Sequence, residues 1–232
     1  MVINEASCCC YIVSEADTHF TIQWKDHNGM HHSGMRCLID GFSAGSTICP
    51  PNGVGQRVGE FVSEERVRPY VFGSLMTSED DMSSRKYLTT APEEKVGSIE
   101  VRVIPVHVRD GRVPFKPSPF AVLGPWAVPV SERSKKAGAH CVKLGRAVKS
   151  KCEQRGISPI NPQAAPYVTF MFSYSSQALL QARGIISPGT TLSALSGKLA
   201  SGLALRTASG VVGGDERSVM RAATCLVKIE ED

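Results

Sequence analysis

Alternation of apolar and polar residues is the dominant pattern along the first two thirds of the chain. In Phe20–Trp24 every second residue is aromatic or aliphatic, and in Ile99–Val103 charged residues separate the apolar ones. A period of two turns one face of an extended chain inward and the other outward, so both stretches predict strands. Seven stretches show this alternation or a strand-like β-branched and aromatic composition: Cys8–Val13, His19–Trp24, Met35–Ile39, Arg68–Leu75, Ser98–Val108, Ala139–Leu144 and Tyr167–Tyr174.

The order of these stretches indicates the fold class. No helical periodicity separates them, which favours a β-sandwich or barrel over a parallel α/β sheet. We predict an antiparallel, jelly-roll-like β-sandwich of about seven or eight strands. The first three strands are expected to form an antiparallel meander, and Pro105 is expected to bend or end its strand.

Two loops and one helix complete the predicted sandwich. Cys49–Gly59 and Arg112–Pro129 are rich in proline or glycine, so we expect mobile loops there. Ser175–Arg183 predicts a short helix with a serine near its start, ended by Gly184.

The chain changes character after residue 186. Leucines recur at roughly helical spacing within Thr191–Ala208, although glycines weaken a helix there, and Asp215–Ile229 predicts another weak helix. We therefore divide the chain into a β-sandwich domain at 1–186 and a weakly helical or disordered C-terminal tail at 187–232.

Length and composition fit an intracellular globular protein. The chain has 232 residues, of which 42% are hydrophobic and 21% charged, and it contains no apolar run long enough to span a membrane. Its eight cysteines, three of them consecutive at Cys8–Cys10, are too sparse for a disulfide scaffold and predict reduced thiols. We expect a cytoplasmic or nuclear location and no membrane partner.

The positive charge is concentrated in one segment. The net charge is +4 overall. By residue count it is −3 for residues 1–130, +6 for 131–155 and +1 for 156–232. Clustered basic charge attracts nucleic acid or an acidic protein surface.

Several of these stretches together resemble an uncharacterised domain family of mushroom-forming (basidiomycete) fungi. The resemblance covers about residues 8–186 and implies no reaction, cofactor or ligand, because the family is defined as a domain of unknown function. Relatives usually carry additional residues before the first strand, which raises the alternative of a missing edge strand. The matching pieces are Cys10–Glu15, Phe20–Trp24, Asp40-Gly41 with Gly45, Arg68–Phe72 with Thr77 and Glu79–Asp81, Gly97–Val101, Glu132–His140 with Leu144-Gly145, and Pro166–Phe170 with Leu180, Ala182, Gly184 and Ile185.

The usual signatures of catalysis and metal binding are weak in this sequence. His27 and His31 have a zinc-like spacing that requires a helix, but Asn28-Gly29 between them favours a solvated hairpin loop that also includes His32. The glycine-rich stretches lack the lysine and serine of a phosphate loop, and no nucleophile elbow occurs. We therefore predict no catalytic residue, no metal site and no cofactor.

The basic segment is the main candidate binding site. The functional interpretation makes Arg133, Lys135, Lys136, His140 and Lys143 a surface for phosphate or an acidic peptide. The structural alternative has Arg133 or Glu132 paired within the domain and Gly138 shaping a turn. The absence of interleaved aromatic residues weakens the case for nucleic acid.

Three hypotheses follow in order. The first is a non-catalytic intracellular module that binds another protein. The second is a weak nucleic-acid or acidic-ligand binder that uses residues 131–155. The third is an enzyme of unrecognised type, which a deep pocket with perturbed titratable groups would indicate.

Overall fold

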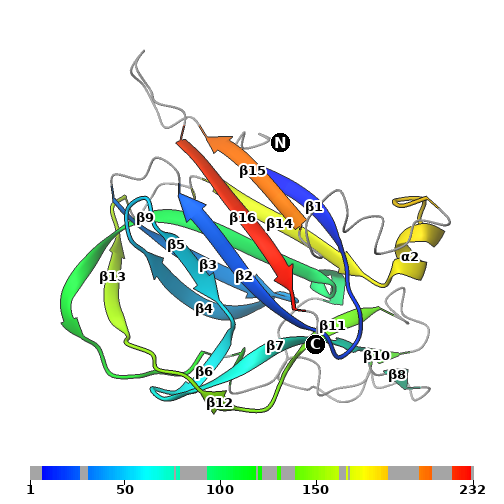
Figure 1. Ribbon diagram of the computed structural model, residues 1–232, viewed down its shortest axis with the longest axis horizontal. Helices are drawn as coiled ribbons and strands as arrows, with labels where there is room; N and C mark the ends of the chain where they lie inside the picture. Colours follow the sequence, from blue (N-terminus) through cyan, green and yellow to red (C-terminus); the bar gives the residue numbers. More distant parts are fainter. Residues whose placement is uncertain are drawn as a thin grey trace.

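A computed structural model shows a mainly β protein built from two sheets packed face to face, the sandwich that the sequence predicts (Figure 1). The structure describes residues 7–26, 31–75, 77–78, 93–118, 120–121, 130–131, 139–161, 166, 168–187, 204–210 and 221–230.

One sheet has six strands and runs in the order β1-β14-β9-β3-β4, with β13 pairing the distal half of β9. Most of its pairs are antiparallel, but β1 and β14 pair in parallel. Its strands are β1 (Ser7–Val13), β3 (His32–Ile39), β4 (Phe42–Cys49), β9 (Ser98–Arg112), β13 (Arg155–Pro159) and β14 (Val168–Ser175).

The other sheet has eight strands and runs in the order β11-β7-β2-β16-β15, with β5 pairing β2 and with β6 and β12 pairing β7. A two-stranded pair joins β8 (Thr77–Ser78) to β10 (Val130–Ser131). The strands of the eight-stranded sheet are β2 (His19–Asp26), β5 (Val54–Arg57), β6 (Gly59–Ser63), β7 (Arg66–Ser74), β11 (His140–Leu144), β12 (Val148–Lys149), β15 (Ala204–Gly210) and β16 (Arg221–Ile229).

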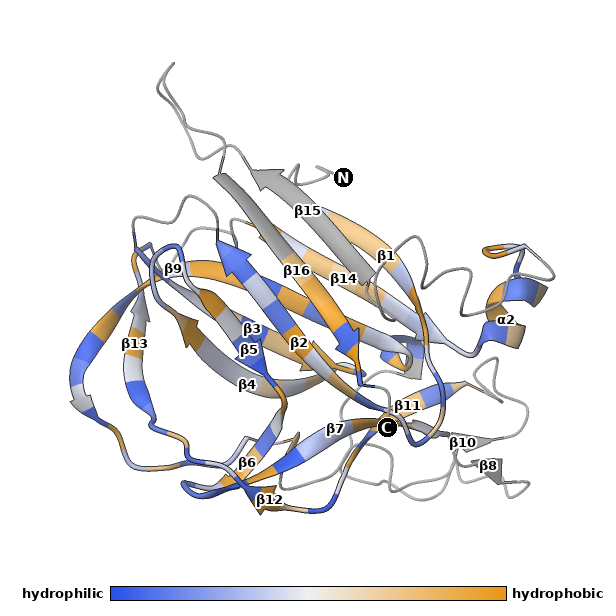
Figure 2. Cartoon of the chain, viewed as in Figure 1, coloured by the Kyte–Doolittle hydropathy of each residue, from blue (hydrophilic) through white to orange (hydrophobic). Residues whose placement is uncertain are grey.

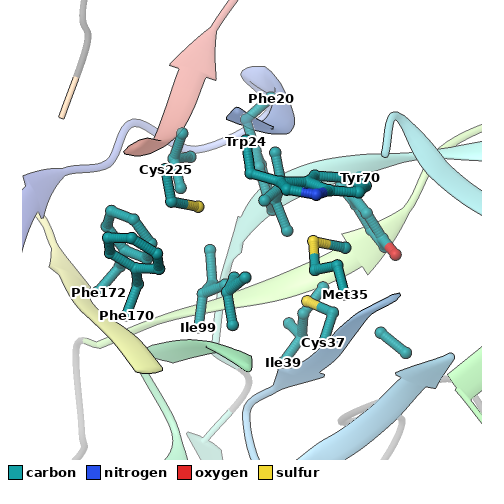
Figure 3. Close-up of a cluster of buried hydrophobic side chains, with 14 of the residues drawn as sticks. Phe20, Trp24, Met35, Cys37, Ile39, Tyr70, Ile99, Phe170, Phe172 and Cys225 are labelled. Atoms are coloured by element: carbon teal, nitrogen blue, oxygen red, sulfur yellow. The ribbon is translucent and has the colours of Figure 1, made fainter. Parts of the chain in front are cut away.

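The core lies between the sheets and follows from the period-two pattern. Along β2 and β9 the apolar positions of the predicted alternation point inward, so that hydrophobic colour alternates along the ribbons (Figure 2). Phe20 stacks on Phe72 with ring centroids 4.3 Å apart. The cluster combines residues from both sheets: Phe20, Trp24, Tyr70 and Cys225 from one, and Met35, Cys37, Ile39, Ile99, Phe170 and Phe172 from the other (Figure 3).

Trp24 fills this core because β5 carries no side chain opposite it. A Cβ atom at Gly55 would lie 2.0 Å from Cζ2 of Trp24, so only glycine fits at this position. The indole can therefore lie flat against the backbone of the neighbouring strand.

The helix forms where the sequence predicts it, and a tight turn joins β3 to β4. Helix α2 spans Gln177–Ala182, and its N-cap Ser176 accepts a hydrogen bond from the Leu179 amide. Asp40 and Gly41 both have positive φ, which forms the two-residue connection between β3 and β4. A 3₁₀ turn at Glu93–Lys95 leads into β9.

The prediction about the first three strands is wrong. The expected meander does not form, because β1 and β3 join the six-stranded sheet while β2 joins the opposite one. Their apolar faces therefore pack against each other across the core instead of lying side by side. Of the two effects expected of Pro105, the structure excludes the end of the strand: β9 continues past it to Arg112, and the Pro105 carbonyl accepts a hydrogen bond from the Ile160 amide at 3.1 Å.

The helices predicted near the C-terminus are also wrong where the structure describes them. Residues 204–210 and 221–229 are the strands β15 and β16, and β16 pairs with β2 from Ala223 opposite Asp26 to Ile229 opposite Phe20. Cys225 and Val227 alternate with Leu226 and are fully buried, which is the period of a strand. The division of the chain at residue 186 stays a prediction.

Candidate functional site

The structure describes two of the five residues of the predicted basic site. Arg133, Lys135 and Lys136 lie outside the described residues, whereas His140 and Lys143 lie on β11. His140 is half-buried, with Nδ1 2.8 Å from the Ser14 hydroxyl, and burial lowers the pKa of its imidazole. His140 therefore acts as a neutral hydrogen-bonding group at neutral pH. Its role as a binding residue, like that of the other four, stays a prediction.

Lys143 has the opposite character. Its side chain is exposed, and its aliphatic stem crosses Gly73 of the neighbouring strand, where an added Cβ would lie 2.4 Å from Cε of the lysine. Further along the basic segment, Arg146, Lys149, Lys151 and Arg155 are also exposed. The described part of the segment thus carries exposed cations at several positions from β11 to β13.

Arg155 of β13 lines a cleft of about 780 Å³, whose lining strands lie at the end of the sandwich opposite α2 (Figure 1). Strands β4, β5 and β6 form one wall, and the distal part of β9 with β13 forms the other. Polar and apolar side chains both line it, a composition common in ligand-binding clefts. Sequence reasoning missed this site because its lining residues come from six separate segments.

A buried ion pair forms the floor of the cleft. Arg57 of β5 donates from Nη2 to Oε1 of Glu60 at 2.8 Å and from Nε to the Tyr70 hydroxyl at 2.7 Å. Glu60 is 1% exposed and also accepts hydrogen bonds from the Tyr70 and Ser118 hydroxyls. Both Glu60 oxygens are therefore occupied, as a buried carboxylate requires.

Arg57 also joins the two sheets across their open edges. Its Nη1 donates to the Ser46 carbonyl at 3.3 Å and to Oγ1 of Thr47 at 3.0 Å, both on β4. Strand β4 ends the six-stranded sheet, and β5 pairs only with β2. The guanidinium therefore fixes the separation of the two strands that form one cleft wall.

A proline-containing segment at 113–121 closes the floor from the other side. The side-chain amide of Gln154 pairs with the Lys116 backbone, accepting from its N–H at 3.1 Å and donating to its carbonyl at 3.3 Å. Phe120 is buried in the core and meets Tyr70 edge to face, with ring centroids 6.1 Å apart. This described part of the loop predicted to be mobile is thus held at both ends.

The charges at the cleft mouth are unequal on its two sides. Lys116 and Arg155 are exposed lining residues, and Arg112 lies beside them. Glu153 accepts from Nε of Arg112 at 3.0 Å and lies 3.7 Å from Arg155, and the Arg112 hydrogen bond lowers its pKa. Among the described residues of the facing wall, Ser46, Thr47 and Gln56 are polar and uncharged, and the charges of Arg57 and Glu60 are paired with each other.

A second buried carboxylate lies away from the cleft. Asp40 is fully buried and accepts hydrogen bonds from the Val142 amide at 2.9 Å, the Gly97 amide at 2.8 Å and the Tyr174 hydroxyl at 2.5 Å. Burial raises its pKa to about 6, although these donors oppose the shift. Asp40 joins the β3–β4 turn to the start of β9, to β11 and to β14.

The predicted histidine loop is only partly described. His27 lies outside the described residues, His31 precedes β3, and His32 is the first residue of that strand. Among the residues that the structure describes, no group of three His, Cys, Asp or Glu side chains could hold a metal ion. Within the same residues, no helix is long and apolar enough to cross a lipid bilayer.

A comparison with protein-family models finds one match. Residues 4–188 match DUF7918, a domain of unknown function. Searches among curated proteins and among solved structures give no match. The matched region includes every residue of the cleft but ends before β15 and β16.

Proposed function

We propose that this chain, which belongs to the DUF7918 family of domains of unknown function over residues 4–188, is a non-catalytic module that binds a segment of another protein in the cleft at the end of the sandwich. We also propose that the family occurs in mushroom-forming fungi and that this protein is located inside the cell.

The observation that carries the proposal is an open cleft with fixed walls. Its volume of about 780 Å³ is in the range of ligand-binding sites. Arg57 holds one wall and Gln154 the other, so the cleft keeps its shape without a ligand. Preorganised walls lower the entropic cost of binding.

The state of the titratable groups in the cleft supports binding over catalysis. Glu60 is fully occupied by three donors, which reduces its capacity to act as a base. Cys152 lines the cleft, and burial raises the pKa of its thiol, which disfavours the nucleophilic thiolate.

A second candidate function is nucleic-acid binding along the basic segment. The exposed cations Lys143, Arg146, Lys149 and Lys151 support it, because cations in a row can follow a phosphate backbone. Such binding would weaken with salt and would not depend on the cleft.

The experiment compares two single substitutions on β4. Ser46 lines the cleft, whereas Ser43 is exposed on the same strand outside it, so S46W should fill the cleft and S43W should not. Proteins captured from a cell extract by the wild type and by S43W, but lost with S46W, support the proposal. An identical set of proteins with all three baits would contradict it.

A further inference from the structure

We infer that the cleft takes an extended, acidic protein segment in which acidic and apolar residues alternate. This inference rests on the proposed function and specifies the chemistry of its partner.

The first step is the charge of the cleft itself. Deep in the cleft, Arg57 and Glu60 neutralise each other at 2.8 Å, so the floor attracts neither sign of charge. At the mouth, Lys116 and Arg155 are exposed and come from segments on the same side. A ligand is therefore attracted by its negative groups at the rim of the cleft.

The second step asks which basic side chains at the cleft mouth can bind a ligand once ion pairs within the protein are taken into account. Glu153 is the acidic group on this side, and it is already bound by Arg112 at 3.0 Å. Its longer contact to Arg155, at 3.7 Å, is a weak exposed pair. Lys116 binds Gln154 through its backbone N–H and carbonyl groups. The ammonium group of the exposed Lys116 side chain can therefore bind a ligand.

The third step is the alternation. Apolar side chains of both walls, Ile48, Val58, Phe61, Val113 and Ile157, lie between the polar ones. An extended chain turns successive side chains to opposite sides, so alternating acidic and apolar residues can meet the cationic rim and the apolar wall together.

The same observations disfavour nucleic acid as the occupant. Among the described residues that line the cleft, Phe61 and His32 are the ones whose rings could stack on a base, and Lys116 and Arg155 are the exposed cations. A phosphate backbone favours a continuous basic track with several stacking platforms. A short acidic peptide needs only a few well-placed cations.

The test uses the full chain and a fluorescent peptide in which Glu and Val alternate, with a Gln–Val peptide of equal length as the neutral control. Anisotropy is measured across a salt series. The double variant K116E/R155E changes the rim, whereas K143E/R146E makes the same change of net charge at exposed residues outside the cleft lining. Thermal unfolding of both variants checks that the fold is intact.

We expect the wild type to bind the acidic peptide in preference to the neutral one, with an affinity that falls as salt rises. K116E/R155E should lose roughly tenfold in affinity, and K143E/R146E less than about twofold. Equal losses in the two double variants would overturn the inference, because charge alone would then explain binding.

Two further outcomes distinguish this inference from the proposed function. If the peptide does not bind while capture remains sensitive to S46W, the acidic class is wrong and the binding module stands. If labelled single- or double-stranded oligonucleotides bind and displace the peptide, the inference is overturned in favour of nucleic acid. Capture insensitive to S46W contradicts the proposed function itself.

Discussion

Glu60 and Asp40 are both buried carboxylates, but the protein compensates them in different ways. Glu60 is paired with the Arg57 guanidinium under the cleft. Asp40 has only neutral partners, three backbone amides and the Tyr174 hydroxyl, deep between the sheets. Glu60 thus has a full countercharge within hydrogen-bond distance, whereas burial without a countercharge raises the pKa of Asp40 to about 6.

The largest expected effect is the loss of the Arg57 guanidinium. Arg57→Met leaves Glu60 buried without its countercharge, and breaking a buried pair in this way typically costs about 3–5 kcal/mol. Urea unfolding of the purified variant measures the change. The double variant R57M/E60Q should recover part of the loss, and a double variant as unstable as the sum of the single ones would refute the pairing argument.

The second effect is a pH dependence due to Asp40. Its folded pKa of about 6 lies above the unfolded value of 3.8, so the folded state holds more protons between these values and stability falls as pH rises through this window. The contribution is of order 2–3 kcal/mol. Unfolding free energies at pH 4 to 7 measure it.

Asp40→Asn is the control for this dependence of the unfolding free energy on pH, and it also gives a third prediction. The slope between pH 4 and 6 should become shallower, because the titrating group is absent. The amide offers one acceptor oxygen where the carboxylate has two, so the Val142 or Gly97 amide loses its partner. We expect a loss of about 1–3 kcal/mol. The exposed Asp110→Asn should leave stability unchanged in the same denaturation assay.

The smallest effect concerns the third donor to Glu60. Ser118→Ala removes one hydrogen bond but leaves Arg57 and Tyr70 in place, so we expect a loss of about 0.5–1.5 kcal/mol. Hydrogen exchange of residues 113–121 should speed up in this variant while exchange in β2 does not change. An unchanged rate at 113–121 would show that Ser118 does not hold this segment.

The sequence predicts the fold class well because the strands have strong local patterns. Phe20, Ile22 and Trp24 face the core as their period indicates. Sheet membership has no such local signal, since β1 and β2 look alike in sequence but join different sheets. Leucines at roughly helical spacing before Ala208 led to a helix prediction where β15 forms, and the alternation around Val227 is too short to indicate β16 by itself.

The cleft was harder to predict for a related reason. Arg57 and Glu60 are three residues apart in a loop-like stretch, and their partners Tyr70 and Ser118 are far along the chain. The sequence shows that Lys116 is a basic residue in a proline-rich loop and that Arg155 is a basic residue at the end of the basic segment. It does not show that both lie at the mouth of one cleft. Their meeting at one cleft depends on tertiary structure alone.

The pairing of β16 with β2 has a consequence for biosynthesis. Trp24 lies opposite Cys225 in the strand register, so the ribosome makes β2 about two hundred residues before the strand that pairs with this edge of it. Such long-range pairing slows folding. Until β16 emerges from the ribosome, this edge of β2 presents backbone N–H and C=O groups that its eventual partner does not yet occupy, and an open strand edge is a target for chaperones that hold nascent chains.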